Sequence, residues 1–92
     1  MNESTKIRVM LVDDQNLVRQ GVRSLLELTE DIEVVAEASD GQEAIDMAPE
    51  VKPDVMLLDI RMPNKNGLDV LKELHEAETL PPTIILTTFD ED

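Results

Sequence analysis

The chain has 92 residues, no cysteine and one aromatic residue, Phe89, and its formal net charge at pH 7 is −13. This length is enough for one domain with a modest aliphatic core, and the lack of cysteine excludes disulfide bonds and thiol chemistry. The excess of acidic residues disfavours direct contact with nucleic acid or an anionic membrane surface, because binding to phosphate groups needs a basic patch. No apolar segment of the sequence approaches the length of a membrane span or resembles a signal peptide, so we expect a cytoplasmic protein.

Four apolar segments are predicted to form strands. Strands are predicted over 7–12, 54–58 and 83–88, and the first two contain the uninterrupted aliphatic runs 9–12 and 55–58 that are typical of buried strands in a parallel sheet. The segment 32–38 alternates instead, with its two glutamates expected on one side and its aliphatic residues on the other. This is the pattern of a half-exposed edge strand.

Three helices are predicted between these strands from apolar residues at helical spacing. The first spans 15–28, the second contains Ala44, Ile45 and Ala48, and the third carries Leu68, Leu71 and Leu74. Pro49 is expected to end or bend the second helix, and Pro81-Pro82 to stop the third. Strands and helices therefore alternate, which with right-handed crossovers predicts an α/β fold with a parallel sheet and helices on both of its faces.

Acidic residues follow two of the predicted strands directly. Asp13 and Asp14 come after the first strand and Asp59 comes after the third. The carboxyl ends of neighbouring parallel strands form the crevice where open α/β sheets bind ligands. Three carboxylates gathered there repel one another and are costly to ionise, and Mg²⁺ with its preference for oxygen ligands relieves that cost. The sequence therefore indicates metal-assisted phosphoryl transfer.

Each of these residues taken alone has a simpler interpretation. Asp13 and Asp14 are equally well explained as turn or N-cap residues before the first helix, and Asp59 as an acid in the turn that follows its strand. Thr87 and Thr88 alone are ordinary β-branched strand residues. It is the combination of acids and threonines that favours a functional site.

Four motifs resemble those of bacterial response-regulator receiver domains, in the same order and spacing along the whole chain. They are Leu11-Val12-Asp13-Asp14, Leu57-Leu58-Asp59-Ile60-Arg61-Met62-Pro63, Gly67 and Leu86-Thr87-Thr88-Phe89. The last motif and the acidic residues after it resemble the NarL/FixJ type, which usually carries a C-terminal helix-turn-helix. The resemblance implies a flavodoxin-like, doubly wound parallel sheet with strand order 2-1-3-4-5 in a complete receiver.

The resemblance also implies a phosphoacceptor and a metal site. Asp59 is expected to take a phosphoryl group from the phosphohistidine of a sensor histidine kinase. Asp14, Asp59 and the backbone carbonyl of Arg61 are expected to bind Mg²⁺, with Mn²⁺ as a possible substitute. Asp13 is expected to help through water or by holding the metal's hydration shell.

Further roles are implied for residues around this site. Thr87 is expected to supply a switch hydroxyl for the phosphoryl oxygen, and Thr88 to be the small neighbour that lets the phosphate approach. Pro63 and Gly67 are expected to shape the loop beyond the acceptor. Arg61 and Phe89 stand where the family tunes how fast the phosphoryl group is lost.

The sequence departs from the family where it ends, before the fifth strand, its phosphoryl-pairing lysine and the last two helices. We therefore expect residues 1–92 to be a single, C-terminally incomplete receiver domain without a DNA-binding domain of its own. DNA contact is expected through a helix-turn-helix of the parent protein. The strand over 83–88 is expected to expose an apolar edge, which favours a dimer, a segment-swapped oligomer or a weakly stable monomer.

Three functions compete at this stage. The first is a phosphoacceptor switch module, which is not an enzyme acting on a separate substrate. The second is a phosphorylation-incompetent interaction module that keeps the receiver fold without its chemistry. The third is a Mg²⁺-dependent phosphatase with an aspartyl nucleophile, which needs a second acid two residues after the nucleophile; Arg61 stands there instead.

Overall fold

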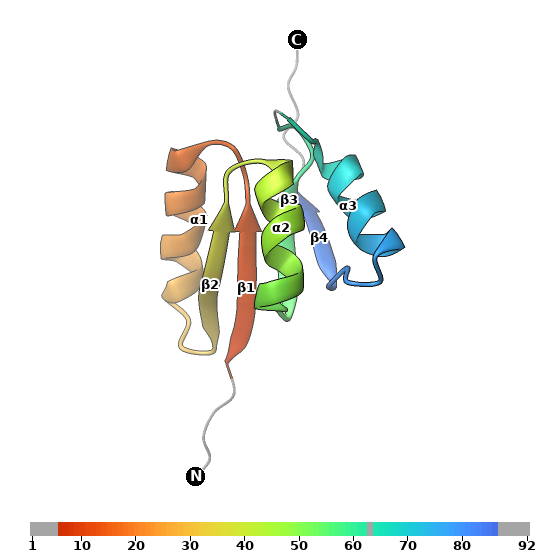
Figure 1. Cartoon of the computed structure of the whole chain (residues 1–92). Coiled ribbons are helices and arrows are strands. Elements are labelled where there is room, and N and C mark those ends of the chain that lie inside the picture. The colour runs from red at the N-terminus through yellow and green to blue at the C-terminus, as the bar shows by residue number, and fades with distance from the viewer. Residues whose placement is uncertain (1–5, 63, 87–92) are drawn as a thin grey trace.

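The computed structural model describes residues 6–62 and 64–86, which form alternating strands and helices (Figure 1). In chain order the elements are β1 (Ile7–Val12), α1 (Asn16–Glu27), β2 (Ile32–Ala38), α2 (Gly41–Val51), β3 (Val55–Asp59), α3 (Gly67–Glu76) and β4 (Thr83–Leu86). The strands form one parallel sheet in the order β2-β1-β3-β4. This confirms the predicted α/β fold and gives the strand order expected for the first four strands of the doubly wound sheet.

One face of the sheet carries the main core. Helices α2 and α3 cover this face and pack against each other, with α2 in front of the sheet in Figure 1. Nine fully buried side chains form the core: Met10, Val12, Ala38, Ala44, Ala48, Met56, Leu58, Val70 and Leu74. It is aliphatic, as the composition predicts, and it anchors the strands whose carboxyl ends carry the acidic residues.

The other face of the sheet is covered less completely. Helix α1 packs mainly on β2, and none of its residues is buried. Val9 and Leu11 of β1 are nevertheless almost fully buried between α1 and the sheet. On β4, Ile84 is 55% exposed and Ile85 is 38% exposed, so the predicted apolar edge is present in the part of this strand that the structure describes.

The face assignment predicted for β2 is wrong in its second half. Val34 is paired with Val9 and Ala36 with Met10, so that the register shifts by one residue at Val35. Successive side chains of a strand point to opposite faces, and an extra residue reverses that alternation. Glu37 therefore lies beside Leu11 on the face covered by α1, and not on the side of the other glutamate.

Neither helix ends at the proline that was expected to end it. Pro49 lies inside α2, which continues to Val51 and ends at Lys52 with a left-handed φ of 51°. Loss of one backbone hydrogen bond near the end of a helix is tolerated when the helix is held by tertiary packing. Helix α3 ends well before Pro81-Pro82, because Glu78 adopts a left-handed φ of 61°.

The end of α3 has the hydrogen bonds of a Schellman motif. The Thr79 backbone N–H donates to the Leu74 carbonyl at 2.9 Å and the Glu78 N–H donates to the His75 carbonyl at 3.0 Å.

Within the described residues, no helix combines the length and the apolar character needed to cross a membrane.

Candidate metal and phosphoacceptor site

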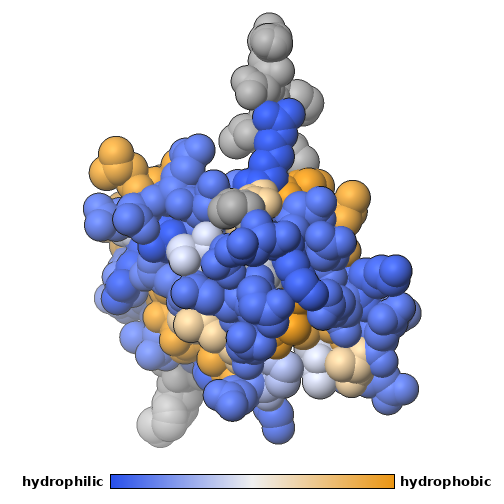
Figure 2. Space-filling view, turned by 45° about the horizontal axis from the view of Figure 1, so that its top comes forward, coloured by the Kyte–Doolittle hydropathy of each residue, from blue (hydrophilic) through white to orange (hydrophobic). Residues whose placement is uncertain are grey.

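The ends of β1 and β3 bring three carboxylates together. Val12 of β1 is paired with Leu58 of β3, so that Asp13 and Asp59 follow at the same level of the sheet. One carboxylate oxygen from each of Asp13, Asp14 and Asp59 lies within 4.8 Å of the others. The structure thus brings together the three acids that the sequence singled out. The end of the molecule that carries them, turned forward in Figure 2, is mostly hydrophilic.

Two of these carboxylates are buried. Asp13 is 8% exposed and Asp59 is 7% exposed, whereas Asp14 is exposed. Burial of a charged carboxylate is costly unless the charge is paired or bound to a metal. The two buried acids and the accessible Asp14 could together hold a cation at the rim of the sheet.

Each of the two buried acids accepts a hydrogen bond from the backbone N–H of the residue two positions later. One Asp13 carboxylate oxygen accepts from the Gln15 backbone N–H at 2.8 Å, and one Asp59 oxygen accepts from the Arg61 N–H at 3.2 Å. Gln15 is the N-cap residue of α1 and makes no side-chain cap bond. Asp13 therefore serves as a turn residue, as its simpler interpretation holds, and keeps a second oxygen for a ligand.

Asp59 is electrostatically unfavourable in its charged form. Burial raises the pKa of the Asp59 carboxyl above its ordinary value, and the negative charges of Asp13 and Asp14 add to the increase. The hydrogen bond from the Arg61 N–H and the charge of Arg61 oppose this change in pKa. A divalent cation among the three carboxylates would favour their ionised forms. The donor set, oxygen atoms from three acids, fits Mg²⁺ or Mn²⁺.

The loop between β3 and α3 packs closely on the rest of the site. A Cβ atom added to Gly41, at the start of α2, would lie 1.9 Å from the Lys65 carbonyl oxygen. A Cβ added to Gly67 would lie 2.7 Å from the Ile60 Cα and 2.9 Å from the Asp59 carbonyl oxygen. Both glycines thus stand where a side chain would meet the backbone of another segment, and the sequence analysis did not single out Gly41.

Hydrogen bonds add to this packing. The Asn64 side chain donates to an Asp40 carboxylate oxygen at 3.0 Å, which ties the loop to the residue that caps α2. The Gly67 N–H donates to the Ile60 carbonyl at 2.8 Å at the start of α3. Asn64 and Gly67, in the loop after the candidate phosphoacceptor, are therefore bonded to the start of α2 and to the residue that follows β3, respectively.

Several predicted site residues are not placed by these observations. Pro63, Thr87, Thr88 and Phe89 lie outside the described residues. Leu86, directly before the two threonines, is paired with Asp59 in the register of β3 and β4. Arg61 lies two residues after Asp59, the last residue of β3, and is exposed; its carbonyl stays a predicted metal ligand.

The family is decided by comparison with known proteins. The response regulator receiver domain family matches residues 9–92. The chain belongs to this family. The nitrate/nitrite response regulator protein NarP of Escherichia coli is 50% identical over 90 residues, which cover 98% of this chain and 42% of NarP. The transcriptional regulatory protein LnrK of Bacillus subtilis is 42% identical over 85 residues, which cover 92% of this chain and 39% of LnrK.

The fold agrees with solved structures of the same family. A DNA-binding response regulator of the LuxR family from Staphylococcus aureus matches with a TM-score of 0.83 and 35% identity, over 92% of this chain and 71% of that chain. These similarities identify a receiver domain of the NarL/LuxR type. The chain spans about two fifths of the length of the curated relatives, at 42% of NarP and 39% of LnrK.

Proposed function

We propose that this receiver domain accepts a phosphoryl group on Asp59 from a sensor histidine kinase, with Mg²⁺ bound by the neighbouring acids. The single observation that carries the proposal is the approach of Asp13, Asp14 and Asp59 to within 4.8 Å at the carboxyl ends of β1 and β3. A site built from two neighbouring strand ends is where open α/β sheets bind ligands. The net charge of −13 also favours a divalent cation as the partner of this site.

The residues divide the chemistry among them. Asp59 is the nucleophile: a carboxylate oxygen forms a bond to phosphorus, the bond from phosphorus to the donor histidine nitrogen breaks, and that nitrogen keeps the electron pair. Asp14, Asp59 and the Arg61 carbonyl would bind the cation directly, and Asp13 would help through water or by holding the metal's hydration shell. When bound, Mg²⁺ supplies the charge neutralisation that lets a carboxylate approach an anionic phosphoryl group.

Transfer leaves an aspartyl phosphate at the rim of the sheet. A phosphoryl group adds about −1.5 to −2 charges and strong acceptor oxygens, and such a charge biases a two-state element beside it. Thr87 is the proposed switch residue, whose hydroxyl donates to the phosphoryl oxygen, and Thr88 is the small neighbour that lets the phosphate approach. Phe89 and Arg61 are proposed to tune how fast the phosphoryl group is lost. The names of the longer relatives NarP and LnrK state a regulatory role. We propose that the protein to which this receiver domain belongs carries a DNA-binding output domain and is cytoplasmic.

Self-association is proposed for this 92-residue chain in solution. The side chains of Ile84 and Ile85 are exposed on β4, beside a strand edge that can pair with another strand. Light scattering is expected to show a dimer or larger species, and Ile84→Lys is expected to shift it towards the monomer. If the unsubstituted 92-residue chain (the parent chain) is well folded and strictly monomeric, this part of the proposal is contradicted.

Phosphorylation by a small phosphodonor such as phosphoramidate tests the main proposal directly. In the presence of Mg²⁺, intact-mass spectrometry is expected to show the addition of one phosphoryl group to the parent chain. Asp59→Asn is expected to abolish the addition, and Asp14→Asn or a chelator to reduce it strongly. A label that persists in Asp59→Asn, or no label on a folded parent chain, contradicts the proposal and favours the interaction module instead.

A further inference from the structure

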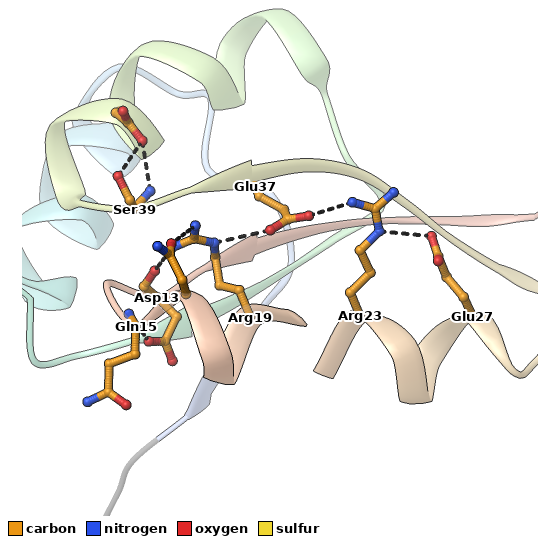
Figure 3. Close-up of polar contacts among 9 residues, drawn as sticks. Asp13, Gln15, Arg19, Arg23, Glu27, Glu37 and Ser39 are labelled. Atoms are coloured by element: carbon orange, nitrogen blue, oxygen red, sulfur yellow. Dashed lines mark hydrogen bonds and ion pairs between the residues drawn. The ribbon is translucent and has the colours of Figure 1, made fainter. Parts of the chain in front are cut away.

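The loop that carries Asp13 and Asp14 is held by an arginine that lies outside the acidic cluster. Arg19, in the first turns of α1, donates from Nη1 to the Asp13 backbone carbonyl at 2.6 Å and from Nη2 to the Asn16 side-chain oxygen. Its Nε donates to a Glu37 carboxylate oxygen at 3.1 Å. Figure 3 shows the guanidinium reaching from α1 to the end of β1 and to β2.

Asp13 is fixed at three points as a result. Its backbone N–H donates to the Ala38 carbonyl at 3.1 Å, its carbonyl accepts from Arg19, and one carboxylate oxygen accepts from the Gln15 N–H. Both backbone groups and the side-chain direction are thereby set. The remaining carboxylate oxygen keeps a defined position toward the other two acids.

Glu37 holds the guanidinium in turn. The register shift in β2 places Glu37 on the face covered by α1, where its two oxygens pair with Arg19 at 3.1 Å and with Arg23 at 2.8 Å. The Arg19 side chain is 14% exposed and the Arg23 side chain is 50% exposed. Of these two ion pairs, the one with Arg19 is therefore the less exposed to solvent and to screening by salt.

We propose that Arg19 is a positioning residue for the metal site, and that Glu37 positions Arg19. This inference rests on the proposed function, because it assigns Arg19 a role in binding Mg²⁺. A planar guanidinium can donate at once to the end of β1, the first turn of α1 and β2, which the single ammonium group of lysine cannot do with the same geometry. Groups that orient metal ligands set metal affinity although they do not touch the metal.

The charge of Arg19 makes the sign of the test informative. A cation near a metal site repels Mg²⁺, so removing it should strengthen metal binding if charge alone mattered. If positioning matters, the same substitution weakens metal binding. Arg23→Gln is the matched control, because Arg23 also bonds to Glu37 but its other partner is Glu27.

The experiment is calorimetric titration of Mn²⁺ into the parent chain, Arg19→Gln, Arg19→Lys and Arg23→Gln. Arg19→Gln is expected to weaken Mn²⁺ binding about 10-fold, and Arg19→Lys to weaken it as well although the charge is retained. Arg23→Gln is expected to bind like the parent chain. Arg19→Gln binding as tightly as the parent chain, or more tightly, overturns the inference.

Two further measurements separate this result from a loss of folding or of the proposed function. Circular dichroism checks that each variant is folded before it is titrated, and trimethylamine N-oxide is added to stabilise any variant that is not. Amide hydrogen exchange without metal is expected to be faster for the Gln15 N–H in Arg19→Gln than in Arg23→Gln. If the parent chain binds no Mn²⁺, the metal site of the proposed function fails, and this exchange rate still decides whether Arg19 positions the loop.

Discussion

The two loops that carry carboxylates to the edge of the sheet are held by different kinds of contact. The loop after β1 is fixed by charged and polar groups, with Arg19 bonded to Asp13 and Glu37. The loop after β3 is fixed by backbone packed against backbone, at Gly41 and Gly67, in addition to the hydrogen bond from Asn64 to Asp40. Close packing around two glycines therefore contributes to the second half of the site and not to the first. The two halves should respond differently to substitution.

The largest effect is expected from a side chain added to the closely packed loop. In Gly41→Ala the new Cβ would lie 1.9 Å from the Lys65 carbonyl oxygen, so that the backbone must move. We expect a loss of about 1–3 kcal/mol in the free energy of unfolding, measured by urea denaturation, together with weaker metal binding.

Gly21→Ala is the control for this substitution. Nothing lies within 4 Å of a Cβ added to Gly21, in the middle of α1. Alanine is preferred over glycine inside a helix, so this variant is expected to gain about 0.5–1 kcal/mol. Equal effects of the two substitutions would contradict the close packing of the loop after β3.

A smaller effect is expected at the cap that ends this loop. The Asn66 side chain accepts from the Asp69 N–H at 2.9 Å, and the Asp69 side chain accepts from the Asn66 N–H at 3.3 Å. Loss of such an N-cap costs about 1 kcal/mol, so Asn66→Ala should lower the thermal midpoint. Asn66→Ser retains a capping oxygen and should stay close to the parent chain. A similar loss in both variants would show that the cap does not carry the effect.

The effect at Asp59 depends on pH and on metal. Its pKa is raised in the folded chain above the ordinary value of 3.8. At a pH between the pKa of the unfolded chain and the raised pKa of the folded chain, the folded state therefore binds more protons than the unfolded state. The stability of the metal-free chain should therefore fall as the pH rises through this window. Asp59→Asn lacks this loss, so its advantage over the parent chain should grow with pH and then level off.

Thermal unfolding in a chelating buffer at several pH values measures this difference. Adding Mg²⁺ should raise the midpoint of the parent chain more than that of Asp59→Asn, because a ligand of the folded state stabilises it. A difference between the two chains that is independent of pH would argue against an unfavourable charge on Asp59.

Much of the fold could be predicted from the sequence, because β1 and β3 contain uninterrupted aliphatic runs and β2 has the alternation of an edge strand. The bounds of β1 and β2 agree with the prediction, and β3 differs from it by one residue at each end. The end of α3 could not be predicted, because residues 68–80 contain no glycine, the usual residue for the left-handed conformation that Glu78 adopts. Pro49 likewise did not mark the end of α2, because a proline close to the end of a helix removes only one backbone hydrogen bond.

The candidate site was predictable only in its acids. Asp13, Asp14 and Asp59 follow directly from where their strands end, since the register of a parallel sheet brings those ends together. Arg19 and Glu37 could not be found, because their pairing depends on a register shift at Val35 that alternation alone does not reveal. Gly41 has a signal only in its turn with Asp40, which gives no indication of the backbone packed against it.

The most direct test of the central claim is a two-dimensional amide NMR spectrum of the chain, titrated with Mg²⁺ and then with beryllofluoride. Beryllofluoride stands in for the phosphoryl group on an aspartate. The account predicts a dispersed spectrum in which Mg²⁺ shifts the amides of Asp13, Asp14 and Asp59, and beryllofluoride then shifts Asp59 and its neighbour Leu86. A dispersed spectrum that responds to neither addition, or the same beryllofluoride shifts in Asp59→Asn, would contradict a phosphoacceptor site at Asp59.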